Sequence, residues 1–68
     1  MTEFEEGVFY SAAIIVETHG QTVVACDLLR EAGLFNSDIS ELDDYEKNAL
    51  KKLNEQEPEC CLTGFDSE

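Results

Sequence analysis

Basic side chains are scarce in this chain. Its 68 residues include only four lysines and arginines against sixteen aspartates and glutamates, which gives a formal net charge of −12. A protein that binds nucleic acid directly has to bring positive charge to the phosphates. The balance therefore argues against nucleic acid as a direct ligand. It favours a basic surface on another protein as the partner, because net charge governs solubility and partner choice.

Long apolar runs are also missing. No run approaches the roughly 20 residues that span a bilayer, and the segment Met1–Glu6 carries three glutamates where a signal peptide has basic residues. The three cysteines are odd in number, and two of them are adjacent, unlike the cysteines of a secreted disulfide framework. We therefore expect no membrane partner, and a cytoplasmic protein with reduced thiols.

Motifs that carry catalysis or bind metals are absent. The residues available for zinc lack the spacing of zinc knuckles, and the acidic surroundings disfavour a reactive cysteine thiolate. The acidic stretch 38–46 has no central glycine, which an EF-hand loop needs. We expect no enzymatic activity, no metal and no cofactor. The zinc ligands considered are His19, Cys26, Cys60 and Cys61.

The composition nevertheless predicts a folded domain. The hydrophobic fraction of 43% is close to that of ordinary globular proteins. A chain of this length hides only about 60% of the surface that its unfolded form exposes. Good helix packing, or a second subunit, is then needed for stability.

Two helices are expected in the first half of the chain. The first runs from about Glu3 to Thr18, with Thr2 as its N-cap and His19-Gly20 at its end. The second covers 21–32 and ends at Gly33. The short connection between them predicts an antiparallel helical hairpin.

A third, amphipathic helix is expected after residue 40. Ser40–Asp43 is similar to a capping box, an apolar stripe follows as far as Leu53, and the helix should end between Asn54 and Pro58. The predicted fold is therefore all-α, with one helical domain at 1–58. Residues 59–68 form a short acidic C-terminal tail, either mobile or docked through two apolar side chains, Leu62 and Phe65.

One alternative is an α+β fold with a β-hairpin around residues 14–25. The segment is rich in β-branched residues and symmetric in polarity about His19-Gly20. Strict alternation is missing, however, and no third strand is available to stabilise such a hairpin.

Two surfaces are candidates for partner binding. An acidic surface on the third helix and the residues after it can meet a basic, nucleic-acid-binding surface, in the manner of a DNA mimic. Small acidic accessory or inhibitor proteins of phages and mobile elements share this size and charge, an analogy of composition only. The predicted acidic residues are Glu41, Asp43, Asp44, Glu46, Glu55, Glu57 and Glu59.

The second candidate surface is apolar and belongs to the helical hairpin. It would form a homodimer or dock on a larger partner, with the acids serving solubility alone. A helix-turn-helix regulator is a weaker alternative, because the segment 16–34 offers a single arginine to the phosphates. The predicted interface residues are Phe4, Val8, Phe9, Ile15, Val24 and Leu28.

Overall fold

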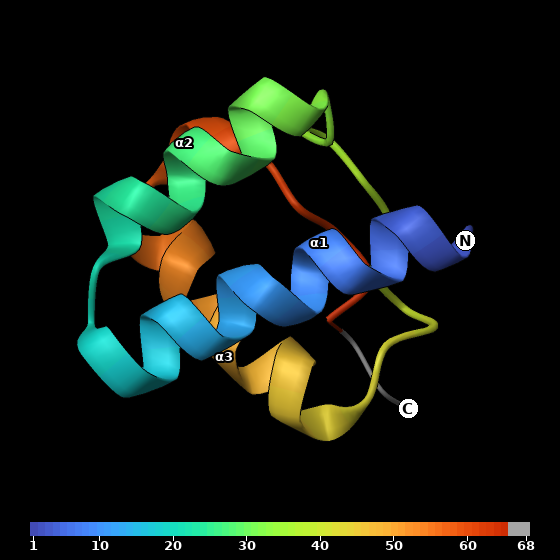
Figure 1. Cartoon of the computed structure of the whole chain (residues 1–68), viewed down its shortest axis with the longest axis horizontal. Coiled ribbons are helices and arrows are strands. Elements are labelled where there is room, and N and C mark those ends of the chain that lie inside the picture. The colour runs from blue at the N-terminus through green and yellow to red at the C-terminus, as the bar shows by residue number, and fades with distance from the viewer. Residues whose placement is uncertain (66–68) are drawn as a thin grey trace.

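The computed structural model describes residues 1–65 and has an all-α fold (Figure 1). Helix α1 (Glu3–Ile14) continues into a π-helical turn, η1 (Ile15–His19). It is followed by α2 (Thr22–Ala32), α3 (Asp44–Gln56) and a short 3-10 helix, η2 (Pro58–Cys60). The alternative β-hairpin around 14–25 is wrong, because these residues are helical on both sides of Gly20 and Gln21.

The predicted ends of the first helix are confirmed. The Thr2 hydroxyl accepts a hydrogen bond from the Glu5 amide at 3.1 Å, and the Glu5 carboxylate accepts one from the Thr2 amide at 3.0 Å. This reciprocal capping box satisfies two of the amides that a helix leaves unpaired at its start. At the other end, Gly20 adopts the left-handed conformation, with φ 64°.

The helical hairpin is also confirmed. Figure 1 shows α2 running back along α1 in the opposite direction. Gly33 closes α2 with φ 72°, and the next amide, that of Leu34, donates to the Leu29 carbonyl at 2.9 Å. This arrangement satisfies carbonyls at the helix end and directs Leu34 into the core.

The start of the third helix differs from the expectation. The helix begins at Asp44, and its capping box joins Asp43 to Glu46 rather than Ser40 to Asp43. Ser40 lies in a turn, where its amide donates to the Asp38 carboxylate at 2.9 Å. Ile39, next to this turn, is completely buried in the core.

All three helices contribute to one hydrophobic core. Five large side chains within it have no exposed surface, and one of them comes from the connection between α2 and α3. Full burial of such a side chain stabilises the fold by about 1.5–3 kcal/mol. These side chains are Phe9, Leu29, Ile39, Leu50 and Leu53.

The segment after α3 packs against the core. Leu62 is 3% exposed, and its backbone amide and carbonyl both bond to the Asn54 side chain. Thr63 pairs with the 37–39 segment through two backbone hydrogen bonds of 2.8 and 2.9 Å. Residues 59–65 are thus docked, largely through Leu62, and the end of the expected tail, 66–68, lies outside the described residues. Within residues 1–65, no helix is both long and apolar enough to cross a membrane.

Candidate functional site

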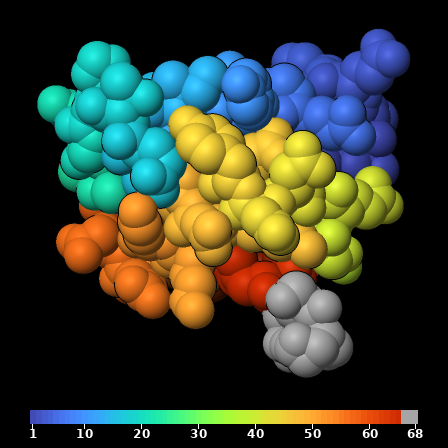
Figure 2. Space-filling model, turned by 90° about the horizontal axis from the view of Figure 1, so that it is seen from below, coloured from blue at the N-terminus to red at the C-terminus, as the bar shows by residue number. Residues whose placement is uncertain are grey.

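Helices α1 and α3 lie side by side and run in the same direction. Figure 2 shows them next to each other on the face seen from below. Tyr10 of α1 contacts Tyr45 of α3, with ring centroids 6.2 Å apart and the planes inclined by 53°. Further along, Lys52 of α3 donates to the carboxylate of Glu17 in η1 at 2.9 Å. The two tyrosines are 51% and 45% exposed, so they form an aromatic surface half in water.

Carboxylates gather beside the tyrosine pair. Glu6, one helical turn before Tyr10, lines a surface hollow of about 140 Å³ together with Glu41 and Asp43. We call this combined surface the tyrosine–acid face. It consists of Glu6, Tyr10, Glu41, Asp43 and Tyr45. It brings an exposed aromatic residue of the hairpin next to the acidic start of the third helix.

The predicted acidic residues do not share one surface. Glu46 is only 9% exposed and accepts from the Asp43 amide at 3.0 Å, so its carboxylate serves the start of α3. Glu57 accepts from the Thr22 hydroxyl at 3.4 Å, and Glu59 bonds to Arg30 at 2.6 Å. These three carboxylates bond to other groups within the protein. The charge pattern of the sequence alone does not reveal these bonds.

The remaining predicted acids are exposed, as is Glu59. Asp43, Asp44 and Glu55 all lie at the surface of or beside α3. Glu41 is exposed as well, and its carboxylate lies 3.0 Å from the amino group of Met1. Asp43 and Asp44 lie at the start of α3, where the helix dipole favours negative charge. They therefore have a structural role in addition to any contact with a partner.

The predicted apolar interface is divided by the fold. Phe9 has no exposed surface and belongs to the core, so the prediction that it lies at an interface is wrong. Phe4 and Val24 are 66% and 48% exposed. The remaining predicted residues, Val8, Ile15 and Leu28, are half-buried against the core.

A larger hollow of about 270 Å³ lies at the start of α1, between Glu5 and the 37–41 connection. Its polar groups are already engaged. Glu5 belongs to the capping box of α1, and the amide of Ser40 donates to Asp38 and thereby lowers the pKa of this carboxyl. The hollow therefore offers fewer free acceptors than its acidic lining suggests.

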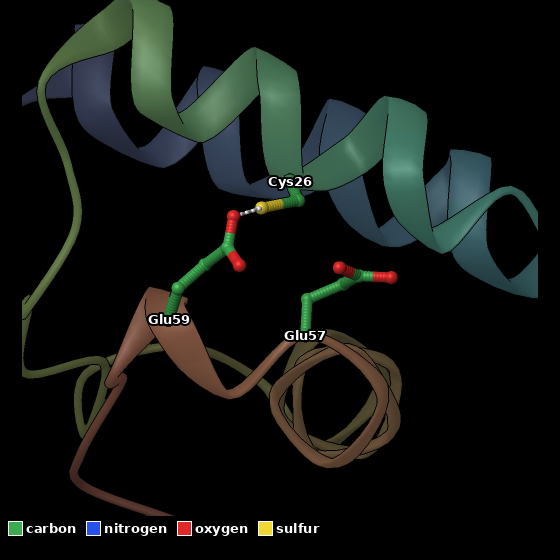
Figure 3. Close-up of side chains that lie close together, drawn as sticks. All are labelled: Cys26, Glu57 and Glu59. Carbon is green, nitrogen blue, oxygen red and sulfur yellow. Dashed lines mark hydrogen bonds between the residues drawn. The ribbon is translucent and has the colours of Figure 1, made fainter.

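A second cluster joins two buried thiols to two carboxylates. The sulfur of Cys26 in α2 lies 3.6 Å from the sulfur of Cys60 in η2. The Cys26 thiol also donates to the Glu59 carboxylate at 3.4 Å, and Glu57 lies beside it (Figure 3). Cys60 has no exposed surface, while its neighbour Cys61 is exposed. No spacing motif marks this pair, since the partners are 34 residues apart.

The environment of these thiols favours their protonated forms. Burial raises the pKa of Cys26 to about 12, and its hydrogen bonds to Cys60 and Glu59 act in the same direction. Burial also raises the pKa of Cys60. Both thiols are therefore poor nucleophiles while the fold is closed, because the thiolate is the reactive form.

One part of this cluster has the chemistry of a cation site. Ligand atoms of Cys26, Glu57 and Glu59 lie within 4.8 Å of one another, and thiolate and carboxylate groups are ligands for zinc. Arg30, however, already places its guanidinium 2.6 Å from Glu59. A divalent ion would have to compete with this internal cation.

In comparisons with known proteins, no family model, no curated protein and no solved structure matches the chain.

Proposed function

We propose that the chain is a non-enzymatic protein-binding module whose tyrosine–acid face binds a basic surface of another protein. The contact between Tyr10 and Tyr45 carries this proposal. Tyrosine is enriched at the energetic centres of protein interfaces, because its ring gives a large contact area with little loss of entropy. Two such rings remain half in water here, where a partner can cover them.

The charges around the tyrosines indicate the chemistry of the partner. Lysine and arginine are attracted to the faces of aromatic rings and also to the carboxylates of Glu6, Glu41 and Asp43 that line the adjoining hollow. A net charge of −12 would speed the encounter with a positively charged protein. Nucleic-acid-binding proteins present such surfaces, so an inhibitory or accessory role in the cytoplasm fits the proposal.

A homodimer is the second candidate. Val23 and Val24 are 60% and 48% exposed at the start of α2, on a part of the hairpin that the tyrosine–acid face does not include. Burial of these side chains against a second copy would be favourable. The helix-turn-helix alternative has weaker support, because Arg30 is already engaged by Asp27 and Glu59.

The test uses a synthetic lysine- and arginine-rich peptide as the probe, titrated into the isotope-labelled full chain and followed by NMR. We expect shifts at the amides of the tyrosine–acid face and an affinity that falls steeply as salt rises. Tyr10→Ala and Tyr45→Ala should each weaken binding by roughly fivefold or more, as expected for central aromatic contacts. Val23→Ala, which removes a similarly exposed apolar side chain from α2, is the matched control and should bind normally.

Shifts spread evenly over all the acidic segments, with unchanged affinity in both tyrosine variants, would count against this face. Sedimentation of the free protein separates the second candidate. A concentration-dependent dimer that Val24→Ser abolishes, and that the tyrosine variants leave intact, would favour self-association.

A further inference from the structure

The two buried thiols are the only pair of cysteine sulfurs in contact among the described residues. The sulfur atoms of Cys26 and Cys60 lie 3.6 Å apart. Cys26 is 2% exposed, and Cys60 has no exposed surface. A disulfide has a sulfur–sulfur distance of about 2.05 Å, so the atoms need to approach by about 1.5 Å. This approach requires rotation of the side chains or a shift of the backbone.

The third cysteine, Cys61, bonds to a different group. Cys61 is exposed, and its thiol donates to the carbonyl of Pro58 at 3.4 Å. Its backbone lies in the left-handed region, with φ 50°, which turns the chain sharply after Cys60. Three cysteines allow three intramolecular pairs, and the geometry favours one of them.

We propose that Cys26 and Cys60 form an intramolecular disulfide site that a low-molecular-weight disulfide, such as glutathione disulfide, oxidises. The site concerns α2 and η2 and is independent of the tyrosine–acid face. Its product ties the segment after α3 to the helical hairpin.

The reaction consists of two thiol–disulfide exchanges. One protein thiolate attacks a sulfur of glutathione disulfide, which forms a mixed disulfide and releases one glutathione thiolate. The second protein thiolate then attacks the protein sulfur of the mixed disulfide and releases the other glutathione. Two electrons pass from the protein to the oxidant, and the two thiol protons end on the two glutathione molecules.

Access to the thiols controls the rate of this reaction. Both residues are buried, and Cys60 lies in η2, just before the segment that is held by the backbone bonds of Thr63 to the 37–39 connection. The oxidant reaches the sulfurs when this short C-terminal segment opens, and local openings of this kind cost less than global unfolding. Once formed, the bond closes a loop that contains all of α3.

The experiment equilibrates the full chain at pH 8 in a series of glutathione buffers that contain EDTA. Free thiols are then blocked with iodoacetamide, and the products are mapped by tandem mass spectrometry. We expect a Cys26–Cys60 link with Cys61 alkylated, and a Tm that rises by roughly 10 °C or more on oxidation, since the link constrains the unfolded chain. Cys61→Ser, the matched control, should give the same link and the same rise.

Cys60→Ala should form no intramolecular disulfide, and its Tm should not respond to glutathione disulfide. Circular dichroism checks that this variant is folded. If it is unfolded, the proposal is judged by whether the Cys61→Ser protein forms the Cys26–Cys60 link. The proposal is overturned by a link between Cys26 and Cys61, by dimers joined through Cys61 alone, or by Cys26 and Cys60 that stay reduced in pure glutathione disulfide.

Discussion

At the scale of single residues, the buried thiol of Cys26 makes the stability of the fold depend on pH. It faces the titratable groups of Cys60 and Glu59, with Glu57 and the guanidinium of Arg30 close by. Its pKa of about 12 in the fold lies above the ordinary value of 9.0, mainly because burial disfavours the thiolate. Below pH 9 the thiol is protonated whether the chain is folded or not. Above pH 9 the unfolded chain loses this proton first, so stability falls as pH rises towards 12.

We therefore predict that the free energy of unfolding of the reduced protein declines above pH 9, and that Cys26→Ala makes this decline shallower. Urea denaturation at several values between pH 7 and pH 10.5 measures both slopes. Cys61→Ala, which changes an exposed thiol, should keep the wild-type slope. An identical alkaline slope in all three proteins would contradict the assignment.

At the scale of the helices, the acidic residues divide into those that cap helices and those that face solvent. Glu46 was predicted to bind a partner, yet it is 9% exposed and closes the capping box of α3 with Asp43. Glu5 does the same for α1 with Thr2. Part of the negative charge is therefore explained by helix ends, where amides need acceptors and the dipole favours anions.

Glu46→Ala should destabilise the protein by about 1 kcal/mol, because the Asp43 amide loses its acceptor. Glu46→Gln is the matched control, since an amide oxygen can take the same hydrogen bond. Chemical denaturation compares the two. Equal losses in both variants would point to the charge of Glu46, and not to its hydrogen bond, as the source of the effect.

At the scale of the whole molecule, the C-terminal segment completes the core. Leu62 and Cys60 are buried although they follow the last long helix, and Thr63 pairs with the connection between α2 and α3. Gly64, with φ 91°, allows the two segments to approach, because a Cβ there would lie 2.7 Å from the Ser40 amide nitrogen. The side chains of Cys60 and Leu62 thus belong to the same core as those of the three helices.

Leu62→Ala should cost about 2–5 kcal/mol, the usual range for truncation of a buried leucine. A domain of this size has little stability to spare, so the variant should be partly unfolded at room temperature. Urea denaturation and one-dimensional NMR measure the loss. The exposed neighbour provides the control, and Cys61→Ser should change stability by less than about 0.5 kcal/mol.

Local sequence signals determined the helices and several of their ends. Thr2 with Glu5, Gly20 and Gly33 specify caps through bonds and backbone angles within a few residues, so they could be recognised without the fold. Spacing of apolar residues gave the three helices for the same reason. The scarcity of basic residues likewise restricts the partners that the chain can bind.

Only the tertiary structure decided which side chains meet. The contact of Tyr10 with Tyr45 and that of Cys26 with Cys60 join residues about 35 positions apart, and no local signal encodes such distances. Burial also removed Phe9 and Glu46 from the surfaces predicted to bind a partner, because a residue's exposure depends on which elements pack over it. Charge and periodicity are properties of the chain, whereas a surface or a thiol pair arises only when helices and connections pack around a shared core.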